Sequence, residues 1–116
     1  RARRYRLAGG ADVPKKQEIT VYAPPAVVAA VDRHHQRCSD LGLAVRRSVA
    51  AEALCRLAPV GVCAVPRVGP AERLPVYAAP DVRGRVYAVA SGSGVGASAA
   101  ACALILAGAE TLKEDR

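Results

Sequence analysis

The sequence contains no Phe, Trp or Met, and its aromatic side chains are four tyrosines. Deep small-molecule pockets are usually lined with aromatic side chains, and proteins that bind single-stranded nucleic acid stack the bases on them. The shortage of rings therefore argues against both classes. Hydrophobic residues still make up 52% of the 116 residues, which is too many for a disordered chain. The composition favours one ordinary small domain or two very small ones.

The cysteines lack the spacing of a metal or redox motif. No two of them are separated by two to four residues, which argues against a zinc knuckle and a thioredoxin-type site. We expect small buried thiols and no disulfide framework at Cys38, Cys55, Cys63 and Cys102. This cysteine usage indicates the reducing cytoplasm, where we expect a nucleoid-associated location. Because the basic first residues are not followed by an apolar segment, we expect no signal peptide.

Acidic residues are scarce relative to basic ones. The chain has 17 Lys and Arg against 10 Asp and Glu, a formal net charge of +7, and six of the cations lie in residues 1–17. An arginine-rich excess of this kind favours a polyanionic partner, most simply nucleic acid. The alternative is a basic tail that only keeps the protein soluble. We expect phosphate contacts from Arg3, Arg4, Arg6, Lys15 and Lys16.

Residues 1–17 contain glycine and proline besides their charge, which predicts a basic flexible arm. Residues 18–23 alternate polar and apolar side chains, which predicts a short half-exposed strand. Amphipathic helices are expected over residues 25–41 and 45–58. Their expected apolar faces are Val27, Val31, Cys38 and Leu41 in the first helix and Val45, Val49, Ala53, Leu54 and Leu57 in the second.

The same pattern then returns. Tyr77 takes the place of Tyr22 in the strand, an offset of 55 residues, and Leu104 takes the place of Leu54 in the last helix, an offset of 50. This self-similarity predicts a tandem repeat whose second copy has lost five residues from its first helix and turn. The expected organisation is an arm at 1–17, a first strand–helix–helix repeat at 18–58, a Pro/Gly-rich linker at 59–72, a degenerate second repeat at 73–113 and a tail at 114–116.

A strand followed by two short helices has two unpaired edges, so pairing of two copies is expected. The order strand, proline, helix, glycine and second helix resembles the ribbon-helix-helix family of Arc- and MetJ-type repressors. The first match runs from 19–24 through Gly42 to 47–54, and the second from 74–80 through 94–98 to 103–104. The resemblance implies a mainly α fold with a short β-ribbon, a tandem ribbon-helix-helix (β-α-α-β-α-α) pseudo-dimer.

In that family a two-stranded ribbon enters the major groove of DNA, and its outward side chains contact base edges. The resemblance implies base contacts from Glu18, Thr20, Tyr22, Arg73 and Tyr77. Pro75 offers no base contact, and it removes a ladder donor if it lies in a hydrogen-bonded position. The family also binds phosphate at the start of the second helix. That position implies Arg46, Arg47 and Ser48 in the first copy and Ser98 in the second.

Three other interpretations concern single segments. Residues 86–109 carry no charge and are long enough to cross a bilayer, although a buried helix explains the same stretch. Residues 86–96 could form a strand that enters a phosphate-binding loop, but they lack the Lys-Ser/Thr ending and the dinucleotide spacing. His34 and Cys38 lie one helical turn apart, and two ligands do not make a metal site.

These patterns predict a non-enzymatic, sequence-specific double-stranded DNA-binding protein, either a transcriptional repressor or a plasmid or mobile-element accessory factor. No catalytic residue, metal ligand or cofactor is expected. The expected partners are double-stranded DNA, a second copy of the chain on an adjacent half-site, and a protein partner, but no membrane. The alternatives are a protein-interaction module, like those of antitoxins or relaxase accessories, and a small membrane-associated protein.

Overall fold

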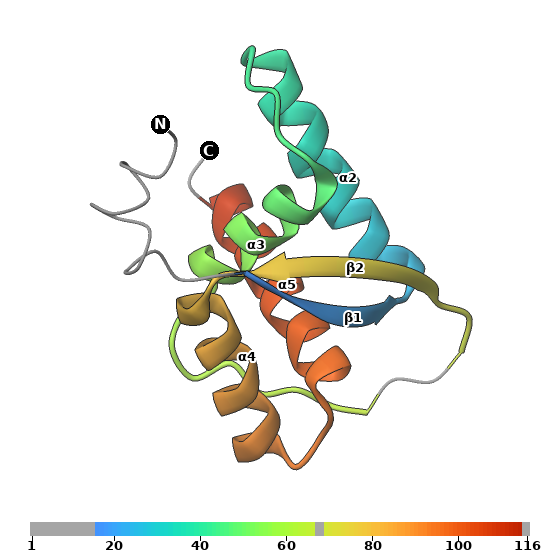
Figure 1. Ribbon diagram of the computed structural model, residues 1–116, viewed down its shortest axis with the longest axis vertical. Coiled ribbons are helices and arrows are strands. Elements are labelled where there is room, and N and C mark those ends of the chain that lie inside the picture. Colours follow the sequence, from blue (N-terminus) through green and yellow to red (C-terminus); the bar gives the residue numbers. More distant parts are fainter. Residues whose placement is uncertain (1–15, 67–68, 115–116) are drawn as a thin grey trace, which may run out of the picture.

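The computed structural model describes residues 16–66 and 69–114, and within them it contains two strands and four helices (Figure 1). In chain order these are β1 (Gln17–Ala23), α2 (Pro25–Asp40), α3 (Arg47–Leu57), β2 (Glu72–Ala78), α4 (Pro80–Ser93) and α5 (Ala97–Glu114). The fold is mainly helical with a two-stranded antiparallel sheet, as predicted. We call β1–α2–α3 the first segment and β2–α4–α5 the second segment.

The two strands form a ribbon whose faces differ. They pair in a register that places Thr20 opposite Pro75 at the centre. Because successive side chains of a strand point to opposite faces, every second residue turns inward. The inward side chains are all buried, and they are Ile19, Val21, Ala23, Leu74, Val76 and Ala78. The intervening residues form the opposite face of the ribbon, which we call the outward face.

Proline and glycine set the ends of several helices. Pro25 and Pro80 stand in the first turn of α2 and α4, where the fixed φ of proline suits the helix and no helical hydrogen bond is lost. The residues before them, Pro24 and Ala79, share an extended backbone, with φ −62° and ψ 163° against φ −68° and ψ 162°. Helix α4 ends at Gly94, which has a left-handed φ of 71°.

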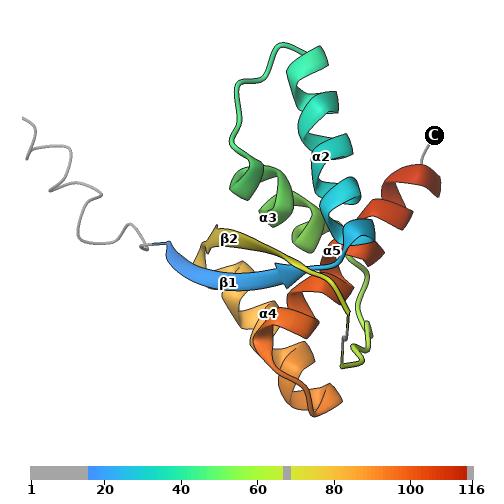
Figure 2. The same ribbon diagram turned by 90° about the vertical axis from the view of Figure 1, so that its right-hand side faces the viewer.

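Helices α3 and α5 connect the two segments. Helix α3 of the first segment packs against β2, and α5 of the second packs against β1. The ribbon lies across these helices, with α2 and α4 at opposite ends of the molecule (Figures 1 and 2). Gly108 of α5 comes so close to α3 that an added Cβ atom would collide with the carbonyl oxygen of Leu54. Each segment therefore completes the core of the other.

Part of the predicted core is wrong. Leu41 is 72% exposed, because α2 ends at Asp40 and its last turn projects away from the other elements (Figure 1). In α3, Val49 and Leu57 are exposed, and the buried residues are Ala50, Ala51, Glu52, Leu54 and Cys55. Helix α3 packs against α2, α5 and β2 together, and close packing on several sides requires short side chains. The apolar face that the hydrophobicity pattern predicted for α3 is therefore rotated about the helix axis relative to the face that is buried.

The cysteine expectation holds for two of four residues. Cys55 and Cys102 are buried, and burial raises the pKa of Cys55 to about 12, so that thiol stays protonated. Cys38 is half-buried, and Cys63 is exposed because it lies on the surface path between α3 and β2. All four are free thiols, as expected.

The connection from α3 to β2 is fixed at two points by the second segment. Arg85 of α4 donates from Nη1 to the carbonyl of Cys55 (2.8 Å) and from Nη2 to that of Ala58 (2.7 Å). A cation placed there also interacts favourably with the dipole of the helix C-terminus. Further along, the amide of Ala64 donates to Ser93 Oγ (2.9 Å), at the end of α4.

The uncharged stretch over residues 86–109 is divided between α4 and α5. Residues 86–90 are helical, so the alternative of a strand entering a phosphate loop is wrong. Within the described ranges, no helix taken alone is long and apolar enough to cross a membrane. Helices α4 and α5 meet that test only as a pair, and the pair is bent by 109°.

Candidate nucleic-acid interface

The outward face of the ribbon carries the five side chains for which base contacts were predicted. Tyr22 and Tyr77 are 56% and 48% exposed, Glu18 and Arg73 are exposed as well, and Thr20 is half-buried. The register places Tyr22 opposite Arg73 at one end of the face and Glu18 opposite Tyr77 at the other. Residues far apart in the sequence therefore form one continuous polar surface.

A small hydrogen-bond network spans this surface. Thr20 Oγ1 donates to Glu18 Oε2 at 3.2 Å, and Arg73 Nη2 donates to the same oxygen at 3.4 Å. Exposed ion pairs of this kind contribute little free energy. Arg73 can therefore exchange the carboxylate of Glu18 for a ligand that offers two acceptors, such as a guanine edge.

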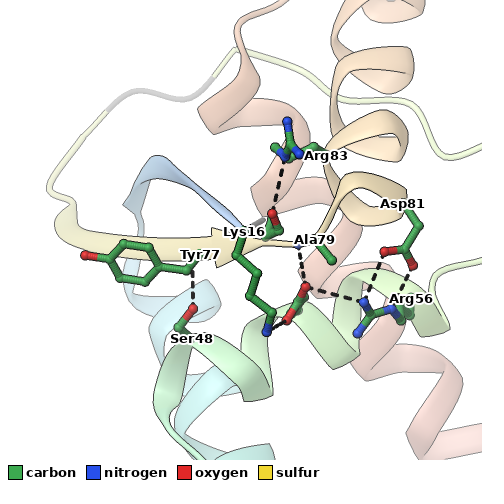
Figure 3. Close-up of polar contacts among 9 residues, drawn as sticks. Lys16, Ser48, Arg56, Tyr77, Ala79, Asp81 and Arg83 are labelled. Atoms are coloured by element: carbon green, nitrogen blue, oxygen red, sulfur yellow. Dashed lines mark hydrogen bonds and ion pairs between the residues drawn. The ribbon is translucent and has the colours of Figure 1, made fainter. Parts of the chain in front are cut away.

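Two serines bind the ribbon in the same way from opposite sides. Ser48, the second residue of α3, accepts a hydrogen bond from the amide of Tyr77 at 2.8 Å (Figure 3). Ser98, the second residue of α5, accepts one from the amide of Tyr22, also at 2.8 Å. The two contacts place one helix N-terminus at each end of the outward face. In both, the serine oxygen accepts, so its hydroxyl proton is still available to an anion.

These contacts also explain how the ribbon accommodates Pro75. In an antiparallel pair, hydrogen-bonded and non-hydrogen-bonded positions alternate. The amides of Tyr22 and Tyr77 turn away from the partner strand to reach the serines, so their positions are non-hydrogen-bonded. Thr20 and Pro75 lie between these two positions with the same parity. The missing N–H of Pro75 therefore removes no ladder bond.

The start of α3 holds two arginines with different surroundings. Arg47 donates from Nε to Asp32 (2.8 Å) and from Nη1 to Glu72 (3.0 Å). These hydrogen bonds, the one to Asp32 first, raise the pKa of Arg47 above its usual value. Arg46 is exposed and has no side-chain partner within residues 16–66 and 69–114. At the start of α3, Arg46 is therefore the arginine whose side chain is available to an incoming anion.

The start of α5 offers a different surface. Gly96 and Ala97 replace the two arginines, so the site has backbone N–H groups and the Ser98 hydroxyl but no charged side chain. A cavity of about 640 Å³ lies beside it, and Tyr22 and Pro66 contribute to its wall. Among the described residues, the start of α5 itself therefore offers an anion backbone N–H groups and the Ser98 hydroxyl.

Lys16 is committed to a contact that sequence reasoning missed. Its Nζ lies 2.8 Å from Oε1 of Glu52, a carboxylate that is only 1% exposed. The second oxygen, Oε2, accepts from the amide of Ala79 at 2.7 Å and lies 3.4 Å from Nη2 of Arg56. Figure 3 shows Lys16, Arg56 and Ala79 converging on this one group. A lone glutamate on an otherwise apolar helix face was the signal available in the sequence.

Four residues for which phosphate contacts were predicted lie outside the described residues, and they are Arg3, Arg4, Arg6 and Lys15.

His34 and Cys38, which lie one helical turn apart, are close in space, with His34 Nε2 3.9 Å from Cys38 Sγ. Burial, and to a smaller extent the nearby charge of Arg37, lowers the pKa of His34. No group of three or more potential metal ligands occurs in the part of the chain that the structure describes.

Comparison with protein-family models, with curated proteins and with solved structures finds no match to this chain.

Proposed function

We propose that this chain is a sequence-specific double-stranded DNA-binding protein in which β1 and β2 enter the major groove as a two-stranded ribbon. The observation that carries the proposal is the pair of serine contacts, Ser48 to the amide of Tyr77 and Ser98 to that of Tyr22. They put a helix N-terminus beside each end of a ribbon whose outward face is polar. A ribbon of two strands fits the width of the major groove, and helix N-termini bind phosphate.

The same contacts support the tandem ribbon-helix-helix arrangement. Both strands have the same burial pattern, both are followed by proline and two helices, and both receive a serine from the opposite segment. We therefore infer a pseudo-dimer within one chain, which resembles the Arc- and MetJ-type repressors in organisation. Repression of a mobile element or of the chain's own operon is the role that fits such a protein.

The two segments would contribute unequally to DNA binding. The first segment offers Arg46 at the start of α3, whereas α5 begins without a charged side chain. On the outward face Arg73 is the one side chain able to make a bidentate contact to guanine, while Glu18 accepts from cytosine. The bound sequence is therefore expected to lack two-fold symmetry within one ribbon's footprint.

The test is selection of bound sequences from a randomised duplex library, followed by titration of the bound fraction against salt. We expect a short enriched motif and a salt slope of about −0.9 per neutralised phosphate. A steep slope without any motif would reduce the proposal to nonspecific binding by the basic residues. Absence of binding even at low salt would refute it.

A protein-interaction role is the second candidate, and one observation favours it. Leu41 and Leu43, which lie two residues apart between α2 and α3, are 72% and 53% exposed. Contiguous exposed apolar surface often marks a protein contact. Replacement of both by Ser is expected to leave binding of a single DNA site unchanged and to remove a protein contact. Loss of single-site DNA binding in that variant would argue against a separate contact surface.

A further inference from the structure

A cavity of about 300 Å³ lies between α2 and α5, at the level where α5 extends beyond its crossing with α3. We call it the α2–α5 groove. Arg33, His34 and Arg37 of α2 line one wall, and Ala109, Leu112 and Lys113 of α5 line the other. The volume is at the small end of the range for ligand sites. The groove therefore suits a small molecule with both a charged and an apolar part.

The arginines of the groove differ from most others in the fold. Arg47, Arg56 and Arg85 are each engaged by carboxylates or carbonyls. Arg33 and Arg37 have no side-chain partner among the described residues. They are four residues apart on one helix and so face the same side. Two guanidinium groups without a carboxylate partner beside one cavity can each donate hydrogen bonds to a carboxylate.

A third polar group of the groove also lacks a partner. His34 lines the cavity, and its Nδ1 is buried without a hydrogen-bond partner within the described ranges. A buried polar atom without a partner raises the free energy of the fold by about 1–3 kcal/mol. In the tautomer whose Nε2 faces Cys38 as an acceptor, Nδ1 carries the proton.

The acidic residue that lines the groove does not neutralise these cations. Asp40 is held by a hydrogen bond from Gln36 Nε2 at 2.9 Å, on α2 itself. Lys113 is 3.5 Å from Glu110, an exposed pair that leaves the ammonium available. The groove therefore carries a net positive charge.

The second segment has no counterpart of this charge. At the offset of 55 residues, Arg33 and Arg37 of α2 correspond to Ala88 and Gly92 of α4, and His34 corresponds to Val89. The cations of the groove therefore have no counterpart in the second segment. The groove lies beside the part of α5 that extends to Glu114, whereas α3 ends at Leu57.

We propose that the α2–α5 groove binds a small organic carboxylate that carries an apolar chain. Arg33 and Arg37 bind the carboxylate, and Ala109 and Leu112 pack against the chain. This site is separate from the outward face of the ribbon and does not depend on DNA binding.

The test is titration of the full ¹⁵N-labelled chain with octanoate, followed by amide chemical shifts. Octanoate is expected to shift amides of residues 30–40 and 109–113, and the double variant Arg33→Gln/Arg37→Gln is expected to weaken its binding about tenfold. Since neither arginine has a side-chain partner within residues 16–66 and 69–114, the variant should retain the thermal midpoint of the parent. Ala109→Leu, which fills the cavity and keeps both arginines, should weaken octanoate binding as well.

Arg46→Gln is the matched control, because it removes an unpaired arginine elsewhere on the surface and should leave octanoate binding unchanged. Octylamine has the same apolar chain but the opposite charge, so it tests whether the negative charge is needed. Inorganic phosphate is an anion without an apolar chain, so it tests whether the chain is needed. The proposal is overturned if octanoate causes no shift at about 10 mM, or if octylamine or phosphate binds as tightly. It is also overturned if the double variant binds octanoate like the parent. None of these outcomes depends on whether the ribbon binds DNA.

Discussion

The first and second segments make the same contact to the ribbon, but they support it with different chemistry. In each, a serine at the second residue of the last helix accepts a hydrogen bond from a tyrosine amide of the opposite strand. One turn further along α3, Glu52 accepts a hydrogen bond from the amide of Ala79. At the offset of 50 residues, α5 has Cys102 at the place of Glu52.

The cause of this difference lies at the junction of strand and helix. The residue that corresponds to Ala79 is Pro24, and the two share nearly the same backbone angles. Ala79 has an N–H that needs an acceptor when buried, and Pro24 has none. Glu52 thus accepts from a donor that exists in the second segment alone, whereas Cys102 at the corresponding place donates from Sγ to the carbonyl of Tyr22 at 3.6 Å. In each segment, the side chain at this position matches the backbone group that it meets in the other segment.

The crossing of α3 and α5 offers the largest test of this comparison. Gly108 corresponds to Ala58 in the first segment, yet it lies where a Cβ atom meets the backbone of Leu54. Gly108→Ala is expected to lower the free energy of unfolding by roughly 3 kcal/mol, since helix backbones must separate. Urea denaturation measures this change.

Gly84→Ala is the matched control for that substitution. Gly84 lies inside α4, is exposed, and has nothing within 4 Å of an added Cβ. The change should raise the free energy of unfolding by about 0.5–1 kcal/mol, because Ala favours a helix over Gly. Equal effects of the two substitutions would contradict the close approach at Gly108.

The pairing of Glu52 with Ala79 predicts a smaller loss with a specific rescue. Glu52→Cys copies the second segment into the first and leaves the amide of Ala79 without an acceptor, at a cost of about 2 kcal/mol. Ala79→Pro then copies Pro24 and removes that amide, so the double variant should recover part of the loss. The φ of −68° at Ala79 already suits proline.

A double-mutant cycle on thermal or urea unfolding measures this coupling. Glu52→Gln is the control, since its amide oxygen still accepts from Ala79 and the loss should be smaller than for Glu52→Cys. Strictly additive effects of Glu52→Cys and Ala79→Pro would show that the two positions are independent.

On the outward face, the comparison sets Arg73 against Glu18, which stand at the same place in the two strands. Arg73→Ala is expected to cost about 1–2 kcal/mol at one base pair of the selected motif and to relax the preference there. Binding to a panel of single-site variants of the motif measures the effect. A uniform loss over all sequences would make Arg73 a phosphate contact instead.

The smallest expected effect concerns the helix starts. Arg46→Gln should weaken DNA binding and flatten the salt slope by about 0.9, the value for one phosphate. Gly96→Arg places a cation at the corresponding residue of the second segment, where an added side chain meets open space. It should steepen the slope by about the same amount. An unchanged slope in both variants would exclude phosphate from these two positions.

Local patterns predicted the elements of the fold well. Alternating residues predicted the first strand and the repeated pattern predicted the second, and the helices expected at 25–41 and 45–58 agree with α2 and α3 to within two residues at each end. The rotation of α3 could not be predicted, because it depends on packing against three other elements at once. Because Ala50 and Ala51 are buried in place of Val49 and Leu57, α3 buries less apolar surface. Their short side chains allow α3 to pack closely against its neighbouring elements.

The outward residues of the candidate interface followed from strand alternation alone, but their contacts did not. The pairing of Lys16 with Glu52 joins residues 36 apart in the chain, and that of Arg73 with Glu18 joins residues 55 apart. Arg47 was expected to be available to phosphate, yet it lies between two carboxylates. Such contacts arise from tertiary proximity, which no local pattern records.

Both strands of the ribbon belong to one polypeptide, and this determines how many places in the molecule a single codon change affects. In an assembly of two identical chains, every codon change appears at two places, so a substitution that helps one side must be tolerated on the other. Here a substitution at Glu18 removes the acceptor of Arg73 but leaves the identity of Arg73, the residue at the same place in the other strand, unchanged. The two ends can therefore be selected separately, and the pairs Glu52–Ala79 and Cys102–Pro24 are what such separate selection would leave behind.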